Sequence, residues 1–254
     1  MRRSIKICLL CLIPLALIIG IGIFLLGNPL DRPGVRQGAE EYLAKQYPQQ
    51  NLYVADLAYD FNTGHYTVWA ASSDSVDTHF SLSLTPEGLV RWDTYEDDVV
   101  SGQNTLNRLN QAYDKQVKSA LFSLFHEFDF EMLSGFYREQ GNCPTSSPSF
   151  GIDPRGLELD STPDLNALGE QAGVIIVWAN SDAPSEEEAA ALLLAVRDTM
   201  DQANLPFRAV SLRLRQPLAK NGTQNSDDAI SLPFFFREDI TDDGLIQRIR
   251  ESDS

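Results

Sequence analysis

The chain opens with an uninterrupted apolar run. Residues 7–26 carry no charge, and a helix of that length, at about 1.5 Å per residue, matches the thickness of a bilayer's hydrocarbon core. Arg2, Arg3 and Lys6 precede the run and every acidic residue follows it, so the positive-inside rule places the N terminus in the cytoplasm. We therefore predict a single transmembrane anchor within residues 1–30 of a cell-membrane protein, with the C-terminal remainder extracellular.

A cleaved secretory signal is the alternative to an anchor. Such a signal usually has an apolar region of about 7–15 residues followed by a pair of small residues. The run here is longer, and Phe24-Leu25-Leu26-Gly27-Asn28-Pro29 offers no such pair. The sequence favours an uncleaved anchor.

Residues 31–140 predict a helix, a four-stranded antiparallel meander and a long trailing helix. Apolar residues first recur at helical spacing up to Tyr47, where Pro48 ends the helix. Four alternating segments bounded by turn residues follow, at 52–61, 65–71, 77–84 and 89–95. The period-two pattern assigns one face of this sheet to the helix. That face is expected to carry Tyr53, Leu57, Tyr59, Phe61, Tyr66, Val68, Phe80, Leu82, Leu84, Val90 and Trp92.

The opposite face of the meander is predicted to be wet and is the candidate binding face. Its candidate residues are Asp56, Asp60, His65, Trp69, His79 and Asp93. Neutral imidazoles beside carboxylates can bind a divalent ion, but an ordinary polar surface explains the same residues. We expect no metal and no cofactor.

Helical spacing then continues through residues 103–138, which predict one long helix with a continuous apolar stripe. Residues 141–172 are rich in Pro, Gly, Ser, Asn and Asp and are interpreted as a linker, with at most a short strand near 157–159.

Residues 173–254 predict a second, small two-layer α+β domain. Ser185 and Glu188 form a capping box at the start of its clearest helix. The expected elements are a strand at 174–179, the capped helix, strands at 207–215 and 229–236, and a helix at 241–250. The order strand, helix, strand, strand, helix is typical of a helix layer packed on a sheet, so the fold class is α+β throughout.

Charge argues against one class of partner, and cysteine content argues against an internal disulfide. Beyond the anchor, 17 basic side chains face 36 acidic ones, a difference of −19. Such a surface repels phosphate, so nucleic acid is not expected as a partner. Cys143 is the only cysteine outside the anchor, so the extracellular part cannot form an internal disulfide.

No motif of a known catalytic class is present. The sequence has no Gly-x-Ser-x-Gly elbow, no phosphate-binding glycine loop and no Cys-x-x-Cys pair. Asp239–Ile246 echoes a calcium loop, but Arg250 stands where that loop needs a glutamate. We expect no enzyme. The alternatives are a hydrolase of cell-wall material that uses paired carboxylates, and a cation-responsive sensor.

Several short segments carry a family resemblance. They are the anchor with Asn28-Pro29, Tyr42-Leu43 and Tyr47-Pro48, Tyr59-Asp60-Phe61, Asp77-Thr78-His79-Phe80, Asp93-Thr94-Tyr95, Ser101-Gly102-Gln103-Asn104-Thr105 and Arg108-Leu109. With them the chain resembles the YfjL-like family of membrane-anchored proteins of Gram-positive bacteria, well over residues 1–115 and loosely beyond.

The resemblance implies a location in the bacterial cell envelope, and it brings no activity and no catalytic residues. The helix-plus-meander unit is also similar to PepSY-type and cystatin-like domains, by analogy of fold alone. We therefore expect a non-catalytic binding or regulatory module with an envelope protein as partner.

Overall fold

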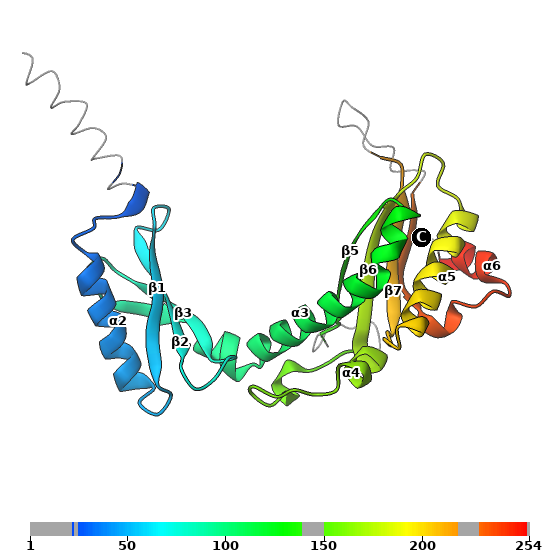
Figure 1. The fold of residues 1–254 in the computed structure, drawn as a ribbon. Helices are drawn as coiled ribbons and strands as arrows, with labels where there is room; N and C mark the ends of the chain where they lie inside the picture. The colour runs from blue at the N-terminus through cyan, green and yellow to red at the C-terminus, as the bar shows by residue number, and fades with distance from the viewer. Residues whose placement is uncertain (1–21, 23–24, 139–149, 218–228, 253–254) are drawn as a thin grey trace, which may run out of the picture. The chain divides into compact units, whose positions relative to one another are not determined.

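The computed structural model describes residues 22, 25–138, 150–217 and 229–252. These residues form an α+β fold with two four-stranded sheets (Figure 1). No helix within the described ranges is long and apolar enough to cross a membrane. The predicted anchor over residues 7–26 lies almost wholly outside those ranges and stays a prediction.

The chain divides into two compact units. The N-terminal unit contains the residues up to Asn104 together with Glu158–Asp160, and the C-terminal unit contains Thr105–Leu157 and the residues from Ser161 onward. The sequence placed the first boundary near residue 140. The division falls earlier because helix α3 packs its apolar stripe into the core of the C-terminal unit.

The N-terminal unit is a helix packed on a four-stranded antiparallel meander, which confirms the prediction for this part of the chain. Its strands are hydrogen-bonded in the order β1-β2-β3-β4. The elements are α2 (Arg32–Gln46), β1 (Leu52–Asp60), β2 (His65–Ser72), β3 (His79–Leu84), β4 (Val90–Asp93) and a closing π-helical turn η1 (Glu96–Val100). Helix α2 buries Val35, Ala39 and Leu43. These side chains form one core with buried residues of β1, β2 and β3.

Helix α2 comes unusually close to the turn between β3 and β4. A Cβ added to Gly38 would lie 2.1 Å from the carbonyl oxygen of Gly88, so no side chain fits at residue 38. Gly88 has a φ of +83°, a left-handed conformation that favours glycine. Two glycines therefore set the distance between the helix and the sheet.

Two bulges change which side chains face the helix. In β1, Val54 pairs with Ala70 but Asp56 pairs with Trp69, so Ala55 is an extra residue. One extra residue moves the preceding side chains to the other face. Val54 is therefore buried, and Tyr53, which was predicted to face the helix, is exposed.

The second bulge lies in β4. Leu84 pairs with Val90, whereas Ser83 pairs with Trp92. The prediction that Trp92 faces the helix is therefore wrong, and so is the prediction that Asp93 faces water, because Asp93 pairs with the fully buried Leu82. Phe61, also predicted in the core, lies just beyond β1 and is half exposed.

The segment Glu158–Asp160 belongs to the N-terminal unit through the loop that joins β2 to β3. The amide of Asp160 donates to Asp77 Oδ2 over 3.0 Å, and the amide of Asp77 donates to Asp160 Oδ1 over 2.9 Å. Ser75 Oγ donates to the same Asp160 oxygen over 3.1 Å. The sequence allowed at most a short strand near residues 157–159, and the structure has a turn at residues 159–160.

The long helix predicted over residues 103–138 is wrong in its second half. Helix α3 (Gln103–Ala120) continues as a 3-10 helix η2 (Leu121–His126), and the chain then forms a strand, β5 (Phe130–Phe136). Phe130, Met132 and Phe136 are buried while Glu131 and Leu133 are exposed. This alternation is the period of a strand.

The C-terminal unit is a four-stranded mixed sheet in the order β5-β6-β7-β8, with α5 connecting the parallel strands β6 and β7. Ser185 Oγ accepts the amide of Glu188 over 3.2 Å, as the predicted capping box requires. A helix, α4, stands in the expected linker. The elements after β5 are η3 (Pro154–Gly156), α4 (Leu165–Ala172), β6 (Gly173–Asn180), α5 (Glu186–Gln202), β7 (Ala209–Arg215), β8 (Ile230–Phe236), η5 (Arg237–Asp239) and α6 (Leu245–Ser252).

Side chains from α3 cover the outer edge of β5. The amide of Ser134 donates to Asp114 Oδ1 over 2.8 Å, and the amide of Phe136 donates to Asn110 Oδ1 over 2.8 Å. An edge strand with free amides is a template for pairing with another chain. Here two side-chain acceptors take the place of a neighbouring strand.

The close approach of α2 to the β3–β4 turn gives a stability prediction. Gly38→Ala should lower the free energy of unfolding by about 1–3 kcal/mol, because the helix must move off the turn. Gly34→Ala, where a Cβ meets no atom within 4 Å, should raise it by about 0.4–1 kcal/mol. Urea unfolding of both variants measures this, and equal effects at the two glycines would contradict the packing described.

Candidate functional site

The sheet face opposite helix α2 is the candidate functional site, and we call it the open face. Cross-strand partners share a face of a sheet, so the pairings define its membership. One row joins Asp56, Trp69 and Ser81, and a parallel row joins Ala58, Thr67, Ser83 and Trp92. Tyr53, Ala71 and His79 form a third row, and Asp60 and His65 pair at the end of the hairpin.

Five of the six predicted binding-face residues lie on the open face: Asp56, Asp60, His65, Trp69 and His79. They do not converge on one point. His79 pairs with Ala71, six residues along β2 from His65, which is roughly 20 Å at about 3.3 Å per residue. The two histidines therefore cannot share a ligand the size of a metal ion.

The two carboxylates of the open face make local bonds. Asp60 accepts the amide of Asn62 over 2.9 Å and the hydroxyl of Thr63 over 3.0 Å, and these bonds hold its pKa below the usual range. Asp56 accepts the amide of Leu57 over 2.7 Å. In the described part of the chain, no three His, Cys, Asp or Glu side chains are grouped to hold a metal ion.

Aromatic rings are the distinctive feature of the open face. Tyr53, Trp69 and Trp92 are 51%, 42% and 54% exposed. The positions between them carry small side chains, namely Ala58, Thr67, Ala71, Ser81 and Ser83. Large rings around a surface of small residues suit a partner that lays flat or aliphatic groups against the sheet, because aromatic side chains contribute large contact areas with little loss of entropy.

Asp93 belongs to the helix-covered face, contrary to the prediction. Its Oδ2 accepts the hydroxyls of Tyr42 over 2.5 Å and Tyr47 over 3.0 Å, both from the end of α2. The Tyr47 ring packs against Phe80 and Tyr95 with centroids 5.5 and 4.4 Å apart. Asp93 is thus a joint between helix and sheet.

This joint shifts the acidity of both phenols. Desolvation by burial, together with the hydrogen bond to Asp93 and its negative charge, raises the pKa of Tyr42 to about 12. The same causes in the same order raise the pKa of Tyr47 further.

The outer edge of the sheet at β1 is occupied by arginines of α2. Arg32 Nη2 donates to the carbonyl of Leu57 over 3.0 Å, and Arg36 Nη1 donates to the carbonyl of Val54 over 3.2 Å. A partner strand adding to this edge would have to displace both bonds. Recognition through the open face needs no such displacement.

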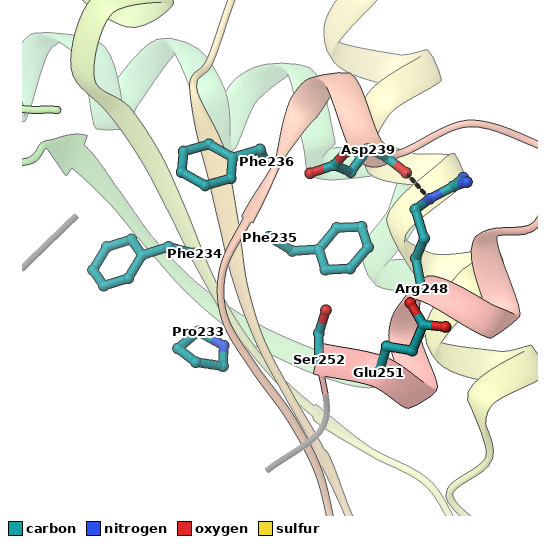
Figure 2. Close-up of a pocket in the computed structure, with 8 residues that line it drawn as sticks. All are labelled: Pro233, Phe234, Phe235, Phe236, Asp239, Arg248, Glu251 and Ser252. Carbon is teal, nitrogen blue, oxygen red and sulfur yellow. Dashed lines mark hydrogen bonds between the residues drawn. The ribbon is translucent and has the colours of Figure 1, made fainter. Parts of the chain in front are cut away.

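The C-terminal unit contains a cavity of about 320 Å³ between β8 and α6 (Figure 2). Three consecutive phenylalanines from Phe234 to Phe236 line it with Asp239, Arg248 and Glu251. The Arg248 guanidinium donates to the carbonyls of Asp239 over 2.9 Å and Thr241 over 3.0 Å. Both carbonyl oxygens belong to Asp239–Ile246, the segment whose sequence resembles a calcium loop. In the structure they accept hydrogen bonds from the Arg248 guanidinium.

A second cavity, of about 450 Å³, lies at the C-terminal end of α5 and is lined by Met200, Asp201, Pro206, Phe207 and Arg237 among others. Arg237 Nη2 donates to both carboxylate oxygens of Asp201, over 2.7 and 2.8 Å. In both cavities the arginine is thus held by bonds to neighbouring chain segments.

Sequence reasoning missed Tyr53 and Trp92 as members of the site. Strict alternation placed both toward the helix, and each was moved to the open face by a bulge in its own strand. No signal within either strand marks the bulge, because its position depends on pairing with the neighbouring strand.

Comparison with known proteins gives a family across most of the chain. A family model described as "YfjL-like, N-terminal domain" matches residues 1–97, and one described as "YfjL-like C-terminal domain" matches residues 103–250. No curated protein matches the chain. A crystal structure of a DUF5037 family protein from Ruminococcus gnavus ATCC 29149 is 12% identical over 85% of this chain and 99% of that one. Its TM-score of 0.25 supports no inference.

The hydrogen bonds of Tyr42 and Tyr47 to Asp93 predict that the folded protein loses stability at alkaline pH. A phenol whose pKa is higher in the folded state stabilises the fold below its unfolded pKa, and this contribution is lost as pH rises from about 10 to 12. Tyr42→Phe combined with Tyr47→Phe should cost about 1–2 kcal/mol at pH 8 and flatten the alkaline fall. Urea unfolding from pH 8 to 12 measures both effects, with Tyr53→Phe as the control that keeps the fall. A double variant with the unaltered pH profile would rule out this origin.

Proposed function

The chain belongs to the YfjL-like family, and we propose that it is a single-pass membrane protein whose extracytoplasmic part binds a partner protein in the bacterial cell envelope. In this proposal the open face of the N-terminal sheet is the binding surface, and the protein carries out no reaction of its own.

The observation that supports the proposal most is the difference in burial between the two faces of the N-terminal sheet. Helix α2 covers one face completely enough that Tyr66, Val68 and Leu82 are fully buried. The other face presents Trp69 and Trp92 to solvent. Exposed tryptophans on a polar surface are typical of binding hot spots, and these two add nothing to the core of this unit.

The open face also indicates the chemistry of the partner. Its charged members Asp56 and Asp60 are acidic, within a protein whose net charge is −16. An acidic partner would be repelled, so the partner should combine flat or aliphatic groups for the rings with lysines or arginines at the rim. Because Arg32 and Arg36 occupy the β1 edge, docking on the face is favoured over strand addition at that edge.

The location rests on the sequence of the first 30 residues. The uncharged run at 7–26 with Arg2, Arg3 and Lys6 before it supports an uncleaved anchor with a cytoplasmic N terminus. The tether to α2 is short, from Gly27 to Asp31. The partner is therefore expected at or near the outer surface of the membrane.

Binding through the open face predicts which substitutions abolish capture of the partner. Full-length protein with Trp69→Ala or Trp92→Ala, purified from membrane extracts, should lose the copurifying protein that the unaltered chain retains. Both side chains are exposed, so unfolding free energies should change by less than about 0.5 kcal/mol. Phe122→Ala, an exposed aromatic residue of the C-terminal unit, is the matched control. Equal copurification with all three variants would remove the open face from consideration.

The proposed topology predicts the labelling of cysteines in intact cells. A membrane-impermeant maleimide should label the chain at Cys143, and Cys143→Ser should abolish the label, because Cys8 and Cys11 lie in the run assigned to the bilayer. Labelling that requires permeabilised cells would contradict an extracytoplasmic location.

A further inference from the structure

The two ends of the N-terminal sheet differ in what they present. The meander brings the β1–β2 hairpin and the β3–β4 turn to the same end, because Tyr66 pairs with both Tyr59 and Leu84. The β2–β3 connection, which contains Val76, lies at the opposite end. We call the end with the hairpin and the β3–β4 turn the anchor-proximal end.

The chain enters the unit at this end. The hydroxyl of Tyr66 donates to the carbonyl of Asn28 over 3.0 Å, and a Cβ on Gly27 would meet the ring of Tyr59 at 2.7 Å. Helix α2 also starts here, since Gly88 of the β3–β4 turn packs against Gly34 and Gly38. Figure 1 shows the entering chain beside the tip of the β1–β2 hairpin.

Large apolar side chains are exposed at the anchor-proximal end. Leu30 in the tether, Phe61 in the hairpin and Leu89 in the β3–β4 turn are 83%, 49% and 65% exposed. They come from three segments that are distant in sequence. Leu25 and Leu26, the last residues of the apolar run, are also exposed in this structure.

We propose that the anchor-proximal end rests on the bilayer, with Leu30, Phe61 and Leu89 inserted in the interfacial region of the outer leaflet. This inference rests on the proposed function, because it takes the apolar run to be a membrane anchor. Beyond that function, we specify which end of the unit meets the membrane and which side chains make the contact.

The short connection between the apolar run and the N-terminal unit keeps this end of the unit at the lipid surface. Leu26 ends the apolar run, and Asn28, two residues later, is bonded to Tyr66. Two residues span at most about 7 Å, so the hairpin cannot move away from the point where the anchor leaves the hydrocarbon. A surface held that close to a bilayer contacts lipid before it contacts any protein, and exposed leucine and phenylalanine side chains gain from burial there.

Charges at the same end limit how deep the contact goes. Asp60 precedes Phe61 and Glu87 lies near Leu89. Local hydrogen bonds from Asn62 and Thr85 hold the pKa values of these carboxyls below their usual ranges, so both remain ionised. Ionised groups stay in the headgroup region, and the apolar side chains reach only the boundary of the acyl chains.

The orientation has a consequence for the open face. With one end of the meander on the bilayer, the strands run away from the membrane surface. Trp69 and Trp92 then face sideways, parallel to the membrane plane. A partner at the open face is thus a neighbour that also stands at the membrane surface.

Fluorescent depth probes test this contact in the full-length protein. Cys8, Cys11 and Cys143 are replaced by serine, and an environment-sensitive dye is attached at Leu89→Cys or Phe61→Cys. The control is Val76→Cys, an exposed residue (66%) at the opposite end of the sheet. In phosphatidylcholine vesicles that contain nitroxide-labelled lipid, dyes at residues 89 and 61 should be quenched several-fold more than the dye at residue 76.

Two results would overturn the inference, and they are distinguishable. Equal quenching at residues 61, 76 and 89 in protein that resists alkaline extraction from the vesicles would refute the contact while the anchor stands. Release of the protein by alkaline extraction would refute the anchor and, with it, the contact. Because all three labelled positions are exposed, urea unfolding should show the same stability for each variant.

Discussion

The packing of one helix on one face of the N-terminal sheet decides most of what this unit can do. Helix α2 is fixed near its start by the approach of Gly34 and Gly38 to Gly88 and at its end by the bonds from Tyr42 and Tyr47 to Asp93. A helix held at both ends cannot slide along the sheet. One face is therefore covered, the other is left to solvent, and the chain enters at a defined end.

The same helix protects the sheet that it covers. Arg32 and Arg36 lie on the side of α2 that reaches the β1 edge, where they occupy backbone carbonyls. In the C-terminal unit, Asn110 and Asp114 of α3 do the equivalent for the amides of β5. Both sheets thus use a helix to block an edge where another strand could add. The other edges of the two sheets are β4 and β8, so this protection applies to one edge of each sheet.

The sequence was a good guide where one periodicity ran without interruption. The α2 helix, the meander and the capped helix α5 were predicted because their apolar residues recur at one spacing and are bounded by a proline, a glycine or the N-cap Ser185. It failed where a single extra residue changes the phase: Ala55 and Arg91 produce bulges that exchange Tyr53, Trp92 and Asp93 between the faces. No local signal marks a bulge, because its energy depends on the partner strand.

Helix α4 and strand β5 were missed for different reasons. The residues around α4 are rich in turn formers, and Asp164 caps a helix of only eight residues, too short for periodicity to show. Strand β5 follows directly after α3 and η2, and its Met132 and Phe136 continue the four-residue spacing of Phe128, which also fits a helical stripe. Tertiary pairing with β6 decides in favour of the strand.

Site-specific photocrosslinking in intact cells is the most direct test that the open face is the binding surface. A photoreactive phenylalanine analogue is placed at Trp69 on the open face or at Glu40, an exposed position of α2. We expect irradiation to join the protein to one discrete membrane-associated protein from residue 69 and not from residue 40. Crosslinks from residue 40 alone would contradict it and would assign recognition to the helix.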